Sequence, residues 1–331
     1  MQQSGGLKMS NLLAKAKMEF KGGLLSRYGY IVILVAILAL FSVLSPRFFT
    51  VNNLMNIGLQ ASIRGILAVG MTIIIISGGI DLSVGMIMSL ASIVLGYTVI
   101  TLKLGMPLGM LSALVTGVVC GAFNGLLITK GKLPPFIATL GLTGIAGGFA
   151  LVISAGYSMY GFPDSFTAIA ANTFLGLPIP LILLLIIGVI YYFFLYSTHA
   201  GRYCFAIGSN EEAAKLSGIN VTRKKMIFYS NMGLLAGFAS IILTSRIASA
   251  HPAAGAGYEL DAIAASVIGG ASLMGGEGSI PGAIVGAIIM ATIQNGLNVL
   301  DVNPFWQKVA IGLILIVAVL MDQLRKDRDR K

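Results

Sequence analysis

The sequence predicts an all-α membrane protein built from about ten transmembrane helices. Of its 331 residues, 56% are hydrophobic and only 10% are charged, whereas a soluble domain has roughly 25% charged residues. The apolar residues form runs long enough to cross a bilayer, which takes about 20 residues per helix. The chain also holds 42 glycines, which permit close helix contacts and broken helices in membranes. This composition excludes a soluble enzyme, a disordered chain and a secreted disulfide scaffold.

Ten apolar segments are predicted to span the membrane. They cover residues 29–45, 61–78, 83–102, 107–129, 136–154, 178–197, 226–247, 259–274, 280–299 and 305–322. Glycines interrupt the third and the eighth segments, so the boundaries of these two are the least well defined. The first segment follows a basic stretch and has no clear small-residue cleavage site. We therefore expect an uncleaved first span rather than a signal peptide.

The basic residues indicate how the spans are oriented. The net charge is +10, and 17 of the 22 Lys and Arg residues lie in four regions: 1–28, 130–132, 202–225 and 325–331. With ten spans, these regions all lie on one side of the membrane, which the positive-inside rule identifies as the cytoplasm. The basic residues are not interleaved with aromatic residues, so we do not expect nucleic acid as a partner.

This orientation divides the chain into three parts. Residues 1–28 form a basic cytoplasmic segment, 29–322 a transmembrane domain, and 323–331 a basic cytoplasmic tail. The longest basic loop, 198–225, is cytoplasmic, and the segment 155–177 has no Lys or Arg and faces outward. We expect a multi-pass membrane protein, with the lipid bilayer around it and both termini in the cytoplasm.

Three sequence landmarks recur in the same order in the two halves of the chain. Residues 79–83 correspond to 258–262, the Asn-Gly-Leu at 124–126 to 295–297, and the Pro-Phe at 135–136 to 304–305. The first Asn-Gly ends a span that runs inward and the second a span that runs outward. The pattern predicts an inverted repeat of spans 2–5 and 7–10, an arrangement common in transporters. Duplication retained for packing alone, or a channel, would also explain it.

Ionisable residues near membrane depth are costly and are usually functional. Asp81, Glu259 and Asp261 stand at the beginnings of predicted helices, where a carboxylate accepts the free amides of a first turn. We expect helix capping, and direct ligand binding or gating is the alternative. Arg64 follows Gln60 by four residues, and we expect it at the outer interface rather than paired within the bundle.

No catalytic group or cofactor site is predicted. The glycine-rich segment 269–278 has no Gly-Lys-Ser/Thr and is therefore not a phosphate-binding P-loop. The two His and two Cys residues have no metal-ligand spacing, so we expect neither a metal nor a cofactor. We read the chain as a non-enzyme.

The loop 198–225 contains a short predicted helix. Ser209 or Asn210 caps it, Glu211 and Glu212 occupy its first turn, and Gly218 ends it after Leu216. A capped helix on a basic cytoplasmic face has the shape of a docking element, although a solvated surface loop explains the pattern equally well.

Five motifs resemble the ribose-type permeases, the membrane subunits of bacterial ATP-binding cassette (ABC) importers for monosaccharides. They are 80–85 (IDLSVG), 135–141 (PFIATLG), 206–210 (AIGSN), 216–219 (LSGI) and 257–264 (GYELDAIA). The resemblance runs from about residue 29 to the end of the chain and includes 295–298 (NGLN) and Gln307. The outer segment 157–164 looks closer to allose-type relatives, which leaves the sugar open.

The resemblance implies an ABC importer permease fold, a homodimer, and a location in the bacterial inner (plasma) membrane. It also implies an extracytoplasmic sugar-binding protein that delivers the sugar and a cytoplasmic ABC ATPase that drives the cycle. In this family the loop after span six contacts the ATPase. That role is carried over to Gly208, Ser209, Asn210, Glu211, Glu212, Ala213, Ala214, Lys215, Leu216, Ser217, Gly218 and Ile219.

A neutral sugar needs a mostly uncharged, hydrogen-bonding path. The polar residues proposed to line that path are Asn56, Gln60, Thr72, Asn124, Asn295 and Asn298. Each of them equally suits a hydrogen bond between helices, which is the commoner role of a polar residue in a membrane. Two alternatives remain: a permease of this family for another small polar solute, such as a nucleoside or a signalling sugar, and an ion-coupled secondary carrier.

Overall fold

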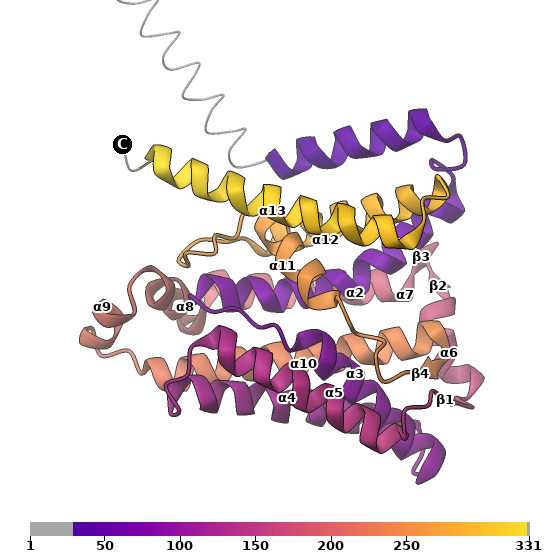
Figure 1. Cartoon of the computed structure of the whole chain (residues 1–331), viewed down its shortest axis with the longest axis horizontal. Helices are drawn as coiled ribbons and strands as arrows, with labels where there is room; N and C mark the ends of the chain where they lie inside the picture. Colours follow the sequence, from indigo (N-terminus) through magenta and orange to yellow (C-terminus); the bar gives the residue numbers. More distant parts are fainter. Residues whose placement is uncertain (1–28, 330–331) are drawn as a thin grey trace, which may run out of the picture.

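The structure, a computed structural model, describes residues 29–329. Within these residues the chain is mostly helical, and most of its long helices run along the longest dimension of the molecule (Figure 1). A helix at Gly29–Leu44 precedes α2 (Val51–Ile76), α3 (Val84–Gly96) with its π-helical continuation η1 (Tyr97–Thr101), α4 (Met106–Thr129), α5 (Pro135–Ser154), α6 (Asp164–Ala171), α7 (Ile179–Ser197), α8 (His199–Ser209), α9 (Glu211–Leu216), α10 (Val221–Ile247), α11 (Tyr258–Ile268), α12 (Ile280–Val299) and α13 (Pro304–Asp329).

Short strands lie at one end of the bundle and α8 and α9 lie at the other (Figure 1). β1 (Met159–Tyr160) pairs antiparallel with β4 (Ser249–Ala250), and β2 (Thr173–Phe174) pairs with β3 (Leu177–Pro178). The predicted outer segment therefore contains α6, a strand that pairs with β4 from a later part of the chain, and a strand that forms a hairpin with β3. These pairings satisfy backbone groups where the chain turns between long helices.

The expected multi-pass helical fold is confirmed. Seven of the described helices are long and apolar enough to cross a membrane, namely α2, α3 with η1, α4, α5, α7, α10 and α12. Gly29–Leu44 and Pro304–Leu320 are shorter apolar helices. The predicted span 61–78 begins too late, because α2 starts at Val51. The predicted basic segment 1–28 lies outside the described residues, and 323–329 of the predicted tail continue α13.

The predicted eighth span, 259–274, is wrong in its second half. α11 ends at Ile268, and the next residues are Gly269 and Gly270, the latter with a φ of +93°. A left-handed residue of this kind ends a helix. α11 has 11 residues, or about 16 Å of helix, which is about half of the hydrocarbon thickness.

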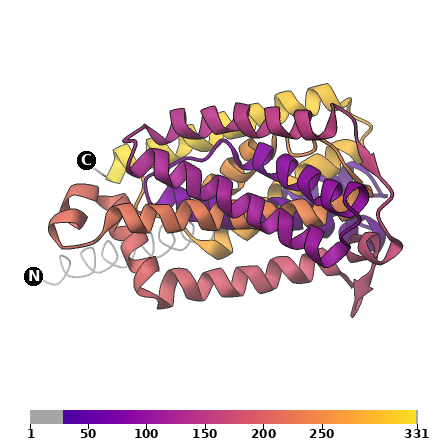
Figure 2. The ribbon, with the colours of Figure 1, turned by 90° about the horizontal axis from the view of Figure 1, so that it is seen from below.

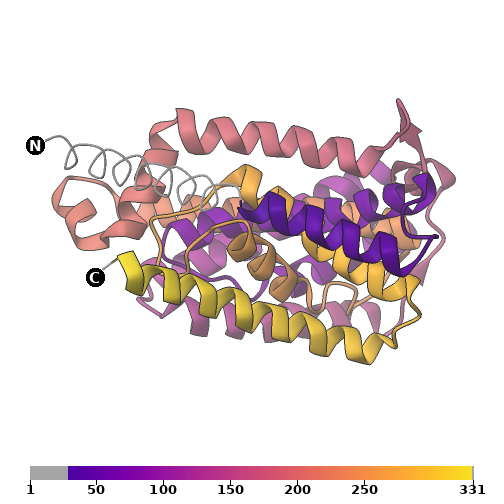
Figure 3. The same ribbon diagram turned by 90° about the horizontal axis from the view of Figure 1, so that it is seen from above.

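α2 is the central helix of the structure. All its residues from Ala61 to Ile76 are buried, and it contacts α7, α10, α11 and α12. A helix that is apolar on every side is stable only when other helices surround it. α7 and α13 lie instead at opposite edges of the bundle (Figures 2 and 3), and the outer side chains of α7 are apolar and exposed, as suits a lipid-facing helix.

α4 and α10 pack backbone to backbone through glycines spaced four residues apart. A Cβ at Gly121 would lie 2.1 Å from the carbonyl oxygen of Tyr229, and one at Gly233 would lie 2.0 Å from that of Gly117. Neither position has room for a side chain. Small residues at this spacing let membrane helices approach closely, and the contact gains van der Waals energy along its whole length.

Candidate functional site

α8 is a helix that the sequence interpretation left as loop. It begins at His199 and ends at Ser209. Thr198 is its N-cap, and the hydroxyl oxygen of Thr198 accepts a hydrogen bond from the backbone amide of Gly201. The helix turns the chain away from α7 at the end of the bundle where α13 also finishes (Figure 1). The predicted docking helix is therefore the second of two consecutive helices.

α9 is the short helix that the sequence predicted. It runs from Glu211 to Leu216, and the side chain of Asn210 accepts the amide of Ala213 at 2.9 Å. Gly218 follows with a φ of +82°, the left-handed conformation that commonly ends a helix. Leu216 is 90% exposed, so α9 presents a large apolar side chain at its end.

Glu211 connects α9 to the beginning of α10. Its carboxylate oxygens lie 2.6 Å from the Nζ of Lys215 and 2.6 Å from the Nζ of Lys225. Partial burial raises the pKa of Glu211, but the hydrogen bonds from the two lysines outweigh it and hold the pKa below its usual 4.5. The carboxylate is therefore charged at neutral pH. Because the pairs are partly exposed, solvent screens them, so their main effect is to orient α9.

The end of α8 packs against the end of α2 without intervening side chains. A Cβ at Gly208 would lie 1.6 Å from the carbonyl oxygen of Ile76. The same oxygen accepts the amide of Gly276 at 2.9 Å, and the thiol of Cys204 donates to the carbonyl oxygen of Ile73 at 3.3 Å. We call these five residues the α2–α8 junction. It joins α8 directly to the central helix, and α9 follows α8 in the chain.

A buried polar cluster holds the break between α2 and α3. One carboxylate oxygen of Asp81 accepts the amide of Ser83 at 2.9 Å and its hydroxyl at 2.5 Å. Asn124 on α4 donates to the hydroxyl oxygen of Ser83 at 2.8 Å. All three side chains are fully buried. Asp81 therefore bonds to the N-cap residue of α3 rather than to amides inside the helix, and the cluster fastens the break to α4.

Arg64 does not lie at the outer interface as expected. It is 5% exposed, its Nε lies 2.8 Å from Oδ2 of Asp261, and it donates to the side chain of Gln294. The guanidinium also lies 5.4 Å from the centre of the Tyr258 ring. The expectation failed because it used only the spacing from Gln60, whereas the carboxylate comes from α11, nearly 200 residues later in the chain.

The two carboxylates at the beginning of α11, Glu259 and Asp261, have different hydrogen-bonding partners. Both carboxylate oxygens of Glu259 lie within 3.2 Å of the amide of Gly257, the N-cap residue. Asp261 instead pairs with Arg64. Breaking a buried ion pair of this kind by removing one partner is costly, because the remaining charge is left without compensation. Glu259 thus has a capping geometry and Asp261 does not.

Four of the six pathway candidates bond to neighbouring helices. Thr72 donates to Ser266, Asn124 bonds within the Asp81 cluster, Asn295 exchanges two bonds with Asn53, and Asn298 accepts from Gln307. Asn56 is exposed and Gln60 is half-buried. These last two retain side chains that are accessible to a solute.

The sequence interpretation passed over Asn53, Gln294 and the pairing role of Gln307. Asn53 and Asn295 form a reciprocal pair with distances of 2.8 and 2.9 Å between amide nitrogen and oxygen. The spacing of these polar residues indicates only that they share helix faces. Gln294 and Asn298 are four residues apart, as are Gln60 and Arg64, so each pair occupies one face of its helix. No signal in one sequence indicates that the two faces meet.

These features define a multi-pass membrane protein of the permease class. A family described as "Branched-chain amino acid transport system / permease component" matches residues 53–319, and the chain belongs to it. It is 42% identical to the ribose import permease protein RbsC of Bacillus subtilis, over 96% of this chain and 99% of the relative.

Two further relatives are also sugar permeases. RbsC of Escherichia coli K12 is 41% identical over 89% of this chain and 93% of its own length. The D-allose transport system permease protein AlsC of the same organism is 38% identical over 90% of this chain and 92% of its own length. The family resemblance inferred from the motifs is thus confirmed, and these relatives are transport subunits rather than enzymes. No solved structure matches the chain.

Proposed function

We propose that this chain is the membrane-spanning subunit of an ATP-driven importer for a ribose-like monosaccharide. The observation that carries the proposal is the 42% identity to a ribose import permease over nearly the full length of both chains. The allose permease is almost as similar, so the proposed substrate class is a monosaccharide and ribose is its first candidate. ATP hydrolysis takes place in a separate cytoplasmic subunit.

The segment Gly208–Ile219 is the proposed contact with that ATPase. Its support is structural: Leu216 is exposed at the tip of α9, Glu211 holds the helix to α10, and Gly208 contacts the end of α2. A force applied to α9 therefore reaches the central helix through packed backbone. Rigid, closely packed elements are the physical means by which two distant sites influence each other.

The proposed architecture has ten spans, in which α2–α5 and α10–α13 form inverted repeats. The order of elements supports it. A long helix, α2 or α10, is followed by a break, by a shorter helix with a carboxylate in or just before its first turn, and by another long helix. The fourth member of each unit begins with a proline, Pro135 in α5 and Pro304 in α13. Both chain termini and α9 lie on the cytoplasmic side of the bacterial inner membrane in this proposal.

The sugar path is proposed to lie between two copies of the chain, with an extracytoplasmic binding protein delivering the sugar. Asn56 and Gln60 are the proposed contacts, since both side chains remain accessible. Neither carries a charge, so each can exchange hydrogen bonds with hydroxyl groups without holding a sugar tightly. Specificity then depends mainly on the binding protein.

The test is reconstitution in proteoliposomes with the partner ATPase and the partner binding protein. We expect uptake of labelled ribose that requires both partners and ATP and that ionophores do not abolish. Uptake by this chain alone, collapsing with a proton or sodium gradient, would instead establish an ion-coupled carrier. Thermal-shift screening of the binding protein against sugars and nucleosides identifies the solute.

A further inference from the structure

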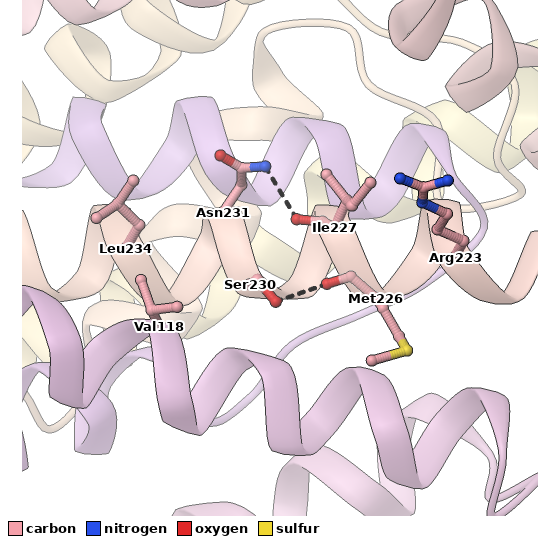
Figure 4. A pocket seen from close by; sticks show the side chains of 7 residues that line it. All are labelled: Val118, Arg223, Met226, Ile227, Ser230, Asn231 and Leu234. Atoms are coloured by element: carbon pink, nitrogen blue, oxygen red, sulfur yellow. Dashed lines mark hydrogen bonds between the residues drawn. The ribbon is translucent and has the colours of Figure 1, made fainter.

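A groove runs along α10 beside α4, on the half of the helix nearest α9 (Figure 4). Its volume is about 420 Å³. The lining residues are Val118 of α4 and Arg223, Met226, Ile227, Ser230, Asn231 and Leu234 of α10. The groove lies beside the glycine contact described above, where Gly117 and Gly121 bring the two backbones together.

The inner part of the groove is compatible with a hydrocarbon chain. The hydroxyl of Ser230 donates to the carbonyl oxygen of Met226 at 2.8 Å. The side-chain amide of Asn231 donates to the carbonyl oxygen of Ile227 at 2.9 Å. The side-chain oxygen of Asn231 accepts the hydroxyl of Tyr191 on α7 at 3.2 Å. The polar groups are therefore already bonded, and what remains facing the groove is mainly apolar.

The mouth of the groove is positively charged. Arg223 stands in the first turn of α10 and is exposed, and no carboxylate among the described residues lies within ion-pair distance of it. α4 runs antiparallel to α10, with Gly125 against Met226. Lys130 and Lys132, which follow α4 and are exposed, therefore emerge at the same mouth.

We propose that this groove binds an anionic phospholipid, with the phosphate at Arg223 and one acyl chain along α10 toward Leu234. From Arg223 to Leu234 the helix rises about 16 Å, close to the roughly 15 Å between a membrane surface and its midplane. A basic pocket between helices at a membrane surface is a known type of lipid headgroup site. The proposal is independent of the transported solute.

Native mass spectrometry of the full chain tests the proposal with phosphatidylglycerol and phosphatidylcholine of identical acyl chains. We expect phosphatidylglycerol to bind Arg223→Gln about fivefold more weakly, since one basic residue supplies about 1 kcal/mol at a membrane surface. Lys103→Gln is the matched control: it removes one exposed positive charge at the other end of α4 and leaves binding unchanged. Val118→Trp fills the groove and removes the bound lipid.

Three results would each overturn the proposal. The first is equal phosphatidylglycerol binding by Arg223→Gln and the unaltered protein. The second is retention of the lipid by Val118→Trp. The third is efficient disulfide cross-linking between two copies of Val118→Cys in native membranes, which would make the groove an interface between protomers. Val118→Cys leaves Arg223 and the fold intact, so cross-linking can be measured even if Val118→Trp fails to fold.

Discussion

Replacing Gly208 by alanine should separate ATP hydrolysis from transport. The added Cβ would lie 1.6 Å from the carbonyl oxygen of Ile76, whereas carbon and oxygen atoms ordinarily approach to about 3.3 Å. The end of α8 must therefore move away from α2 by about 1.7 Å. Overpacking of this kind costs about 1–3 kcal/mol. Weakening the bond from Gly276 to Ile76 adds about 0.5–1.5 kcal/mol.

The assay is the amount of sugar imported per ATP hydrolysed, measured with the permease, ATPase and binding protein in proteoliposomes. We expect a several-fold lower ratio for Gly208→Ala, with hydrolysis retained, because α9 still docks while its connection to α2 is loosened. Gly144→Ala on α5 is the control, since nothing lies within 4 Å of its added Cβ. A folded Gly208→Ala variant with the normal ratio would refute a coupling role for the α2–α8 junction.

Three further predictions follow from the same contacts. Arg64→Met should lower the free energy of unfolding by about 3–5 kcal/mol, and adding Asp261→Leu should restore much of it; equal stability of the single and double variants in thermal unfolding would contradict the buried pair. Gly121→Leu should abolish the monodisperse peak in detergent chromatography, because its Cβ alone would lie 2.1 Å from the carbonyl oxygen of Tyr229, and a normal peak would exclude tight α4–α10 packing. Glu211→Gln should keep its melting temperature near neutral pH while protease cleavage at α9 increases. In the unaltered protein, the ion pairs of Glu211 protect α9 from the protease. This protection is complete above the usual carboxyl pKa of 4.5 and is lost as the pH falls through the lower pKa that Glu211 has in the folded protein. Protection that persists at still lower pH would argue against a role of Glu211 in holding α9 to α10.

Local sequence signals were sufficient for much of the fold. Apolar runs of about 20 residues located all of the long helices, and the Asn210 cap with Gly218 predicted α9. Boundaries failed where polar residues lie on a helix that continues beyond the apolar run, as in the first ten residues of α2. α8 escaped prediction because its composition is mixed and its stability comes from contacts with α2 and α7.

The candidate site was only partly predictable. The segment Gly208–Ile219, which is proposed to contact the ATPase, follows from capping rules and family motifs, both of which depend on neighbours in the chain. The α2–α8 junction depends instead on Gly276, which is separated from Gly208 in the chain by α9, α10 and α11. Arg64 and Asp261 were each noticed, but their pairing depends on α2 and α11 lying side by side.

The sequence by itself determined that this protein is a multi-pass helical permease, because scarcity of charge, the length of apolar runs and family motifs are properties of the chain alone. The tertiary structure decided which polar residues bond to one another. Asp261 pairs with Arg64, Asn295 with Asn53, and Gly208 meets Ile76. The physical reason is that a buried polar group must find a partner, and helix packing brings that partner from a distant part of the chain.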